Sequence, residues 1–111
     1  MPTYLIEPCE PLFFRGLARL LLGDPDGAEQ DFRSCLEKGQ AGHEVLGGLG
    51  YALFDQSRLD EAEQAFRDAL KKKETTPDNH LGLALTLFRK GNVADASASL
   101  KRAVALEPVF G

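Results

Sequence analysis

Apolar residues recur at helical spacing along the chain, in short blocks that glycine, proline and polar residues separate. In the middle of the chain Leu46, Leu49 and Leu53 form one such block, and residues 59–70 form a second. The polar pair Gln56–Ser57 interrupts the pattern between them. Strand-type alternation extends nowhere beyond a few residues. This region therefore predicts two helices joined by a tight turn.

This helix pair is one of three copies. The same step of 34 residues separates Ala28 from Ala62 and Ala62 from Ala96. Four further registers follow that step: Gly16, Gly50 and Ala84; Cys35, Ala69 and Ala103; Phe32, Phe66 and Leu100; and Leu36, Leu70 and Val104. Agreement of five registers over three copies predicts three helical hairpins over 9–42, 43–76 and 77–111. The prolines at positions 2, 8 and 11 predict an extended segment over residues 1–8.

Polar residues that cap helices mark where the helices begin. Their side chains accept hydrogen bonds from the free backbone N–H groups of a first turn. Glycines at 23 and 91 suit the tight turn inside a hairpin, because such turns need a positive φ. The predicted caps are Asp24, Ser57, Thr76 and Asn92.

Residue size along the repeat indicates how the helices pack. Small residues at the Gly16 and Ala28 registers allow the two helices of one hairpin to approach closely. The larger residues at the Phe32 register then fill the space between hairpins. In such a stack each hairpin touches only its neighbours.

The repeat resembles the tetratricopeptide repeat family, over about residues 9 to 110. The second copy matches through Leu49, Gly50, Leu53, Leu59, Ala62, Phe66 and Ala69. The third matches through Leu83, Ala84, Leu87, Gly91, Ala96, Ala103 and Pro108, and the first through Gly16, Gly23, Asp24, Ala28 and Phe32. The resemblance implies an all-α, right-handed solenoid of three antiparallel helix hairpins, whose first helices line a concave groove.

The sequence departs from the family pattern at a few positions. Arg15 and Arg19 stand where the family has large apolar residues, and Glu74 stands where it often has proline. The two arginines suit an N-terminal hairpin, because no preceding repeat buries its outer side. The family usually ends with a solvating helix, and the sequence shows none after Pro108.

The resemblance also assigns residues to the concave groove. Large apolar side chains dominate it, and Gly47, Gly48 and Gly82 open room beside them. Apolar stripes on helices usually belong to the core, and Phe14 and Leu21 fit core and groove equally well. For the others we expect a surface that binds an amphipathic helix or an extended apolar peptide. The expected groove residues are Phe13, Leu17, Leu20, Tyr51, Phe54, Leu81, Leu85 and Phe88.

Acidic residues repeat near the start of each first helix, at Glu10, Glu44 and Asp78. Acids in a first turn complement the helix dipole, which alone explains the pattern. The functional alternative is an acidic rim of the groove, which favours a ligand with basic flanks.

Family members that clamp a C-terminal carboxylate use basic residues or asparagine, and this chain lacks them at the matching positions. We therefore expect no co-chaperone role of that type. The positions hold Phe13, Leu17, Gly48, Asp78 and Gly82.

Composition narrows the partners further. The 111 residues fit one domain, and 13 basic against 17 acidic side chains give a net charge of −4, which disfavours nucleic acid. Arg33, Arg67 and Lys101 share one register, but cations late in helices normally form a solvated face. The longest uncharged stretch, Val45–Phe54, is too short to span a bilayer. We expect a cytoplasmic protein.

Residues suited to catalysis or metal binding are scattered. His43 and His80 are isolated, so no metal site is expected. Cys35 occupies a small-residue register and fits a buried position, while Cys9 lies at the edge of the repeats. Gly47 and Gly48 lie inside a helical pattern without a following lysine, so they form no phosphate loop. We expect neither catalysis nor a cofactor.

The ends of the array suggest self-association. Leu100, Val104 and Phe110 lie on the last hairpin with no further helix to cover them, although terminal repeats normally need a polar outer face. Alternatively the segment Tyr4–Ile6 inserts into a groove, its own or that of a neighbour. The leading functional hypothesis is an adaptor or small chaperone that binds a peptide, and the alternative is a self-assembling scaffold.

Overall fold

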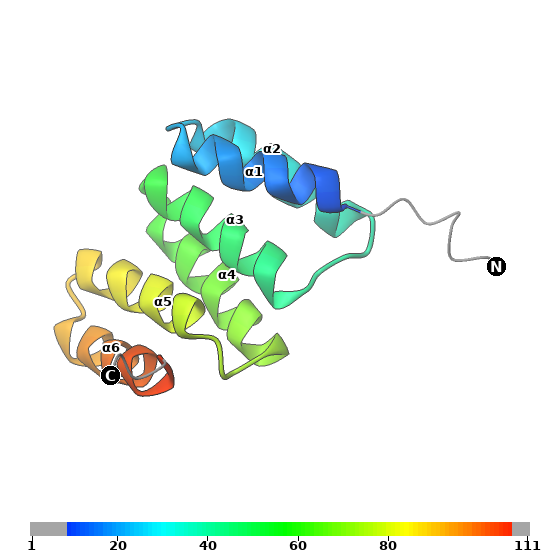
Figure 1. Ribbon diagram of the computed structural model, residues 1–111. Coiled ribbons are helices and arrows are strands. Elements are labelled where there is room, and N and C mark those ends of the chain that lie inside the picture. The colour runs from blue at the N-terminus through cyan, green and yellow to red at the C-terminus, as the bar shows by residue number, and fades with distance from the viewer. Residues whose placement is uncertain (1–8, 108–111) are drawn as a thin grey trace.

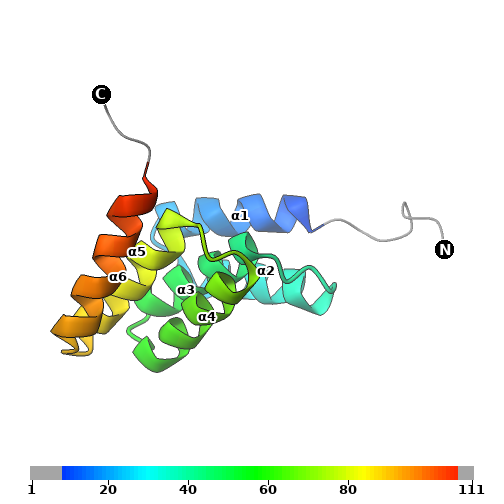
Figure 2. The same cartoon turned by 90° about the horizontal axis from the view of Figure 1, so that it is seen from below.

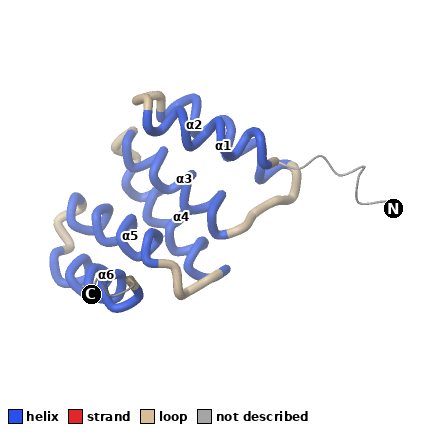
Figure 3. The backbone as a smooth tube through the Cα atoms, viewed as in Figure 1, coloured by secondary structure: helices blue, strands red, loops and turns tan. Residues whose placement is uncertain are grey.

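The computed structural model describes residues 9–107, and within this range the chain forms six helices and no strand (Figures 1 and 3). This confirms the predicted all-α array of three hairpins. The predicted extended segment over residues 1–8 lies outside the described residues. The helices are α1 (Glu10–Leu21), α2 (Pro25–Glu37), α3 (His43–Asp55), α4 (Leu59–Lys72), α5 (Pro77–Arg89) and α6 (Val93–Leu106).

Each hairpin turn contains one residue with a positive φ, at Gly23 (83°), Ser57 (62°) and Gly91 (87°). The three positions share one register of the repeat. Ser57 is therefore a turn residue, and its predicted role as a helix cap is wrong, because the N-cap of α4 is Arg58. The left-handed conformation that glycine adopts readily in the other two hairpins is forced on a serine here.

The other predicted caps fall at helix N-termini. The side chain of Asp24 accepts from the backbone N–H of Gly27 at 3.0 Å, and that of Asn92 accepts from Asp95 at 3.4 Å. Thr76 precedes α5 as predicted, but its hydroxyl donates to the backbone carbonyl of Lys73 instead of capping the helix.

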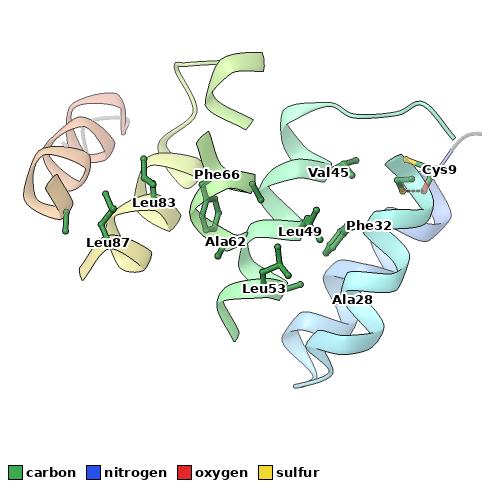
Figure 4. Close-up of a cluster of buried hydrophobic side chains, with 14 residues drawn as sticks. Cys9, Ala28, Phe32, Val45, Leu49, Leu53, Ala62, Phe66, Leu83 and Leu87 are labelled. Carbon is green, nitrogen blue, oxygen red and sulfur yellow. Dashed lines mark hydrogen bonds between the residues drawn. The ribbon is translucent and has the colours of Figure 1, made fainter. Parts of the chain in front are cut away.

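The hydrophobic core centres on two phenylalanine rings, each held between two glycines. Phe32 is fully buried, and its ring lies 2.9 Å from the point that a Cβ on Gly16 would occupy and 2.7 Å from that point on Gly48. Phe66 lies in the same way between Gly50 and Gly82. Figure 4 shows Phe32 facing Leu49 of the next hairpin.

Two of these glycines correct the sequence interpretation. Gly48 and Gly82 were expected to open room beside the groove side chains, but the rings of Phe32 and Phe66 fill the space next to them, where one hairpin packs on the next. We call these contacts, α2 with α3 and α4 with α5, the seams. A ring from the second helix of one hairpin needs a backbone without a side chain on the first helix of the next.

A half-buried glutamate links the two hairpins at each seam. Glu29 on α2 accepts from Gln56 at 2.9 Å and from Arg58 at 2.7 Å, both beyond α3. Its counterpart Glu63 on α4 accepts from Lys90 at 2.7 Å. The same register therefore links successive hairpins twice, and apolar packing and charge act together at the seams.

The outer side of the first hairpin carries a cluster of charged residues. Asp31 is 2% exposed, and both of its carboxylate oxygens accept hydrogen bonds from Arg15 and Arg19. The Arg15 Nη2 atom lies 2.7 Å from Asp31 Oδ1. This agrees with the expectation that the two arginines lie on the outer side of the first hairpin, which no described repeat covers.

Candidate functional site

A concave hollow of about 330 Å³ lies between α1, α3 and the start of α5. Its floor is mostly apolar, and polar backbone and side chains at the start of α5 close one side. We call this space the concave hollow. Its lining includes Phe13, Leu17, Leu20, His43, Glu44, Gly47, Gly48, Tyr51, Thr76, Pro77, Asp78 and Asn79.

The α1 part of the floor consists of three predicted groove residues, Phe13, Leu17 and Leu20. All three are half-buried and pack against the core. The Phe13 ring stands edge-on to Phe32, with centroids 5.9 Å apart. The core therefore fixes one side of each of these residues and leaves the other side facing the hollow.

Tyr51 forms the middle of the floor. Its ring packs edge-on against Phe66 at 4.9 Å, and its hydroxyl donates to the backbone carbonyl of Asp78 at 2.8 Å. Burial, and then the negative charge of Asp78, raise the pKa of Tyr51 to about 12. The hydroxyl is thus a neutral donor that joins α3 to the start of α5.

The other predicted groove residues lie elsewhere. Phe54 is half-buried outside the concave hollow, with the guanidinium of Arg89 4.9 Å from its ring centroid. Leu81, Leu85 and Phe88 line a separate hollow of about 310 Å³ between α5 and α6. Of the predicted groove residues, the structure thus brings together in one site Phe13, Leu17, Leu20 and Tyr51.

Helix stacking explains this division. Leu17, Tyr51 and Leu85 share one register of the repeat. In the first two hairpins the following first helix, α3 or α5, partly covers this register, so Leu17 and Tyr51 are half-buried. Leu85 is 41% exposed because no described helix follows α6.

The predicted acidic rim is present as exposed side chains. Glu44 and Asp78 line the concave hollow, whereas Glu10 lines a neighbouring space at the start of α1. Glu44 Oε1 lies 3.3 Å from Nε2 of His43. No ion pair within residues 9–107 involves Glu10 or Asp78. Among the described residues, the Glu10 and Asp78 carboxylates thus have no basic partner that a ligand would have to displace.

Asn79 is the site residue that sequence reasoning missed. It is 4% exposed, and its amide nitrogen donates to the Thr76 hydroxyl at 2.9 Å. Its side-chain oxygen occupies the space that a Cβ on Gly47 would need. The only signal in the sequence was the pairing of a helical glycine with a polar residue 32 positions later, which no periodicity identifies.

The described residues contain no cluster of three or more His, Cys, Asp or Glu side chains suited to a metal ion. His80 is buried, with its Nε2 atom 2.8 Å from the backbone carbonyl of Glu74. The Cys35 thiol is buried against the Cys9 carbonyl at 3.5 Å, and burial, then Cys9, raise its pKa to about 12. Such a thiol is a poor nucleophile at neutral pH.

A search for bilayer-spanning segments among the described helices finds none of sufficient length and hydropathy.

Several solved structures share this fold. A MamA structure has 24% identity and a TM-score of 0.77, over 88% of this chain and 56% of that one. The Yersinia enterocolitica type III secretion translocator chaperone SycD has 21% identity and a TM-score of 0.80, over 88% and 74%. The second repeat domain of Spaghetti (RPAP3), bound to the HSP90 peptide SRMEEVD, has 13% identity and a TM-score of 0.86, over 95% and 97%.

At these identities the similar structures establish the fold, and the chain spans little more than half of the first of them. A comparison with curated proteins finds no match. Two family profiles described as tetratricopeptide repeat match residues 15–80 and residues 53–109. Together the two matches cover residues 15–109. The chain belongs to the tetratricopeptide repeat family, a fold of protein–protein interaction modules.

Proposed function

We propose that this protein binds an apolar peptide or an amphipathic helix in the concave hollow and acts as an adaptor or small chaperone. The observation that carries the proposal is the hollow itself, whose floor of Leu17, Leu20 and Tyr51 is held from behind by the core. A floor fixed in this way is preorganised, so little ordering of the protein opposes binding. The similar structures of a secretion chaperone and of a peptide complex support this class of function.

The expected affinity depends on the apolar area that a bound peptide covers, in the concave hollow and around it. Covering ~400 Å² of apolar surface at ~25 cal/mol/Å² yields about 10 kcal/mol before opposing terms. Ordering of the peptide and loss of its free motion offset much of this. A partner with micromolar to sub-micromolar affinity is expected.

The charge at the rim defines the ligand further. Glu44 and Asp78 stand at the same edge of an apolar floor, and the net charge of the chain is −4. A ligand whose apolar segment is followed by lysine or arginine gains a charge-assisted contact there. Phosphate-rich partners are repelled, so we propose protein as the partner and exclude nucleic acid.

A peptide library selected on the wild-type protein tests the proposal. The enriched peptides should be apolar with basic flanks, and their binding should be measured by fluorescence anisotropy. Leu17→Asp should weaken binding at least tenfold by placing a charge in the floor. Glu44→Lys, a change at an exposed position, should weaken the binding of basic peptides and strengthen the binding of acidic ones.

Leu22→Asp is the matched control, because Leu22 is 82% exposed and lies outside the concave hollow. It should bind peptides like the wild type. Circular dichroism on each variant shows that the helices persist. Selected peptides that bind Leu17→Asp and Glu44→Lys as tightly as the wild type would place the binding surface elsewhere.

The second candidate function is a self-assembling scaffold. Leu100 and Val104 are 47% and 66% exposed on α6, which agrees with the predicted self-association surface. Phe110 and the segment Tyr4–Ile6, also named for this role, lie outside the described residues. The SycD structure is itself an alternative dimer of that protein.

A further inference from the structure

The last hairpin has an apolar outer face, which we call the end face. It is formed by α5 and α6, and α6 packs on no other described helix (Figure 2). The most exposed members are Phe88 at 64% and Val104 at 66%. The face also contains Leu81, Leu85, Val93 and Leu100.

The end face lacks the residues that the first two hairpins use to bind the next hairpin at a seam. The seams use a phenylalanine ring and a glutamate at two fixed registers, Phe32 with Glu29 and Phe66 with Glu63. The third hairpin has Leu100 and Ser97 at these registers. It offers neither a ring to fill a glycine gap nor a carboxylate to tie a following hairpin, so a further repeat of the same kind is a poor fit.

The opposite end of the array is a poor partner for it. α1 carries Arg15 and Arg19 where α3 carries the buried Leu49 and Leu53. Both arginines are held by the buried Asp31. Head-to-tail stacking of two copies would bury this charged cluster against apolar side chains, at a high desolvation cost.

We infer that the end face pairs with the end face of a second copy about a two-fold axis. This deepens the self-assembly alternative of the proposed function and is independent of the concave hollow. Two α5–α6 hairpins packed face to face make a four-helix layer with one common apolar core. A two-fold contact is closed, so growth stops at the dimer. Both outer ends of the six-hairpin dimer then carry the polar Arg15–Asp31–Arg19 cluster, as terminal repeats require.

The area of the face predicts a weak dimer. α5 has 13 residues and α6 has 14. At 1.5 Å per residue and ~10 Å width, the two helices present roughly 400 Å². A standard stable interface buries about 800 Å² per partner. We therefore expect a dimer in the range of tens of micromolar and a monomer well below it.

Sedimentation velocity of the full chain from about 1 to 500 μM tests this directly. The weight-average mass should rise from one to two chain masses and then stop. Leu100→Asp and, separately, Phe88→Asp should shift the midpoint at least tenfold toward higher concentration. Both side chains are exposed, so circular dichroism should show unchanged helix content.

Two control variants separate this inference from its competitors. Leu22→Asp at the other end should leave the dimer unchanged, and Glu44→Lys should alter peptide binding without altering the dimer. A monomer at every concentration overturns the inference, as does a mass that grows beyond two chains. Loss of the dimer in Leu22→Asp, or its persistence in both end-face variants, also overturns it.

Discussion

The ring of Phe66 lies 2.8 Å from the point that a Cβ on Gly50 would occupy. The third hairpin has Leu100 in place of the phenylalanine and Ala84 in place of the glycine. The side chain on its second helix is therefore smaller, and the residue on its first helix is larger. The two pairs are alternative solutions to one packing problem, because the volume between the helices of a hairpin is limited. The glycine in the second hairpin is therefore a consequence of its phenylalanine.

Gly50→Ala is expected to destabilise the protein by about 1–2 kcal/mol. The added methyl overpacks the core, and this outweighs the ~1 kcal/mol by which alanine favours a helix over glycine. Urea unfolding followed by circular dichroism measures the change.

The double variant Gly50→Ala/Phe66→Leu reproduces the pair of the third hairpin. Its loss of stability should be smaller than the sum of the two single losses, because the shorter side chain makes room for the methyl. Additive effects would show that Gly50 and Phe66 do not share the same space.

The hairpins were predictable from sequence because their determinants are local and repeated three times. Helical spacing recurs in all three copies at a step of 34, and a turn glycine and a capping side chain recur in the first and third copies. Ser57 was misassigned because a serine fits both a cap and, at some strain, a left-handed turn. Comparison with Gly23 and Gly91 at the same register supplies the answer, so here the repeat is more informative than the local residue type.

The site was only partly predictable, because burial across a seam depends on two helices from different copies. Gly48 lines the concave hollow, as expected of a groove residue, but it also receives the Phe32 ring, which its register did not indicate. Leu17 and Leu85 are equivalent in sequence, yet only Leu17 has a following helix beside it. Periodicity identifies a register and says nothing about whether a neighbour covers it.

Ser57→Gly is expected to stabilise the protein by about 0.5–1 kcal/mol. The left-handed conformation at φ 62° costs an L-residue 1–2 kcal/mol or so, and glycine escapes most of it. Loss of the exposed contact from Arg89 at 3.1 Å opposes this slightly. Ser34→Gly, inside α2, is the control and should destabilise by about 1 kcal/mol. A destabilised Ser57→Gly would contradict the argument from turn strain.

Glu63 makes the second seam sensitive to acid. The hydrogen bond from Lys90, and then that from Arg67, outweigh the effect of burial and hold the pKa of Glu63 below its ordinary value of 4.5. A depressed pKa stabilises the folded state above the unfolded value, and this contribution is lost as pH falls through the folded pKa. Glu63→Gln should therefore be less stable than wild type at pH 7, by less than about 1 kcal/mol after solvent screening.

Urea unfolding at a series of pH values checks this. The difference between wild type and Glu63→Gln should close as the pH falls below about 4.5. Glu37→Gln is the control, because Glu37 is exposed and lies outside the seam. A difference in the free energy of unfolding that stays constant down to pH 3 would mean that Glu63 acts through neutral hydrogen bonds rather than through its charge.

Tyr51 has the opposite dependence. Its pKa is raised from 10.0 to about 12, so the folded state keeps a proton that the unfolded state loses. Stability should fall between about pH 10 and pH 12 in the wild type and should not show this component in Tyr51→Phe. At pH 7 the variant loses the bond to the Asp78 carbonyl, at a cost of about 0.5–1 kcal/mol. Absorbance at alkaline pH, compared between the two proteins, follows the ionisation of Tyr51 itself.

The cluster of Asp31 with its two arginines should stabilise the first hairpin and prevent association of copies through its outer side. The second hairpin has Ala65, Leu49 and Leu53 where the first has Asp31, Arg15 and Arg19. Replacing only the arginines by leucine leaves the Asp31 carboxylate buried without a partner and should lower Tm by several degrees. Adding Asp31→Ala removes that charge, so the triple variant should recover the lost stability.

The triple variant should regain stability but expose a new apolar surface on the first hairpin. No described repeat covers positions 15 and 19, so leucines there form a second association surface opposite the end face. Sedimentation should then show masses beyond the dimer, because two apolar ends allow open chains of molecules. The wild type and Asp31→Ala alone keep the arginines and should not exceed two copies. A triple variant that is stable yet limited to the same mass would show that the charged cluster holds the first hairpin together without determining how copies associate.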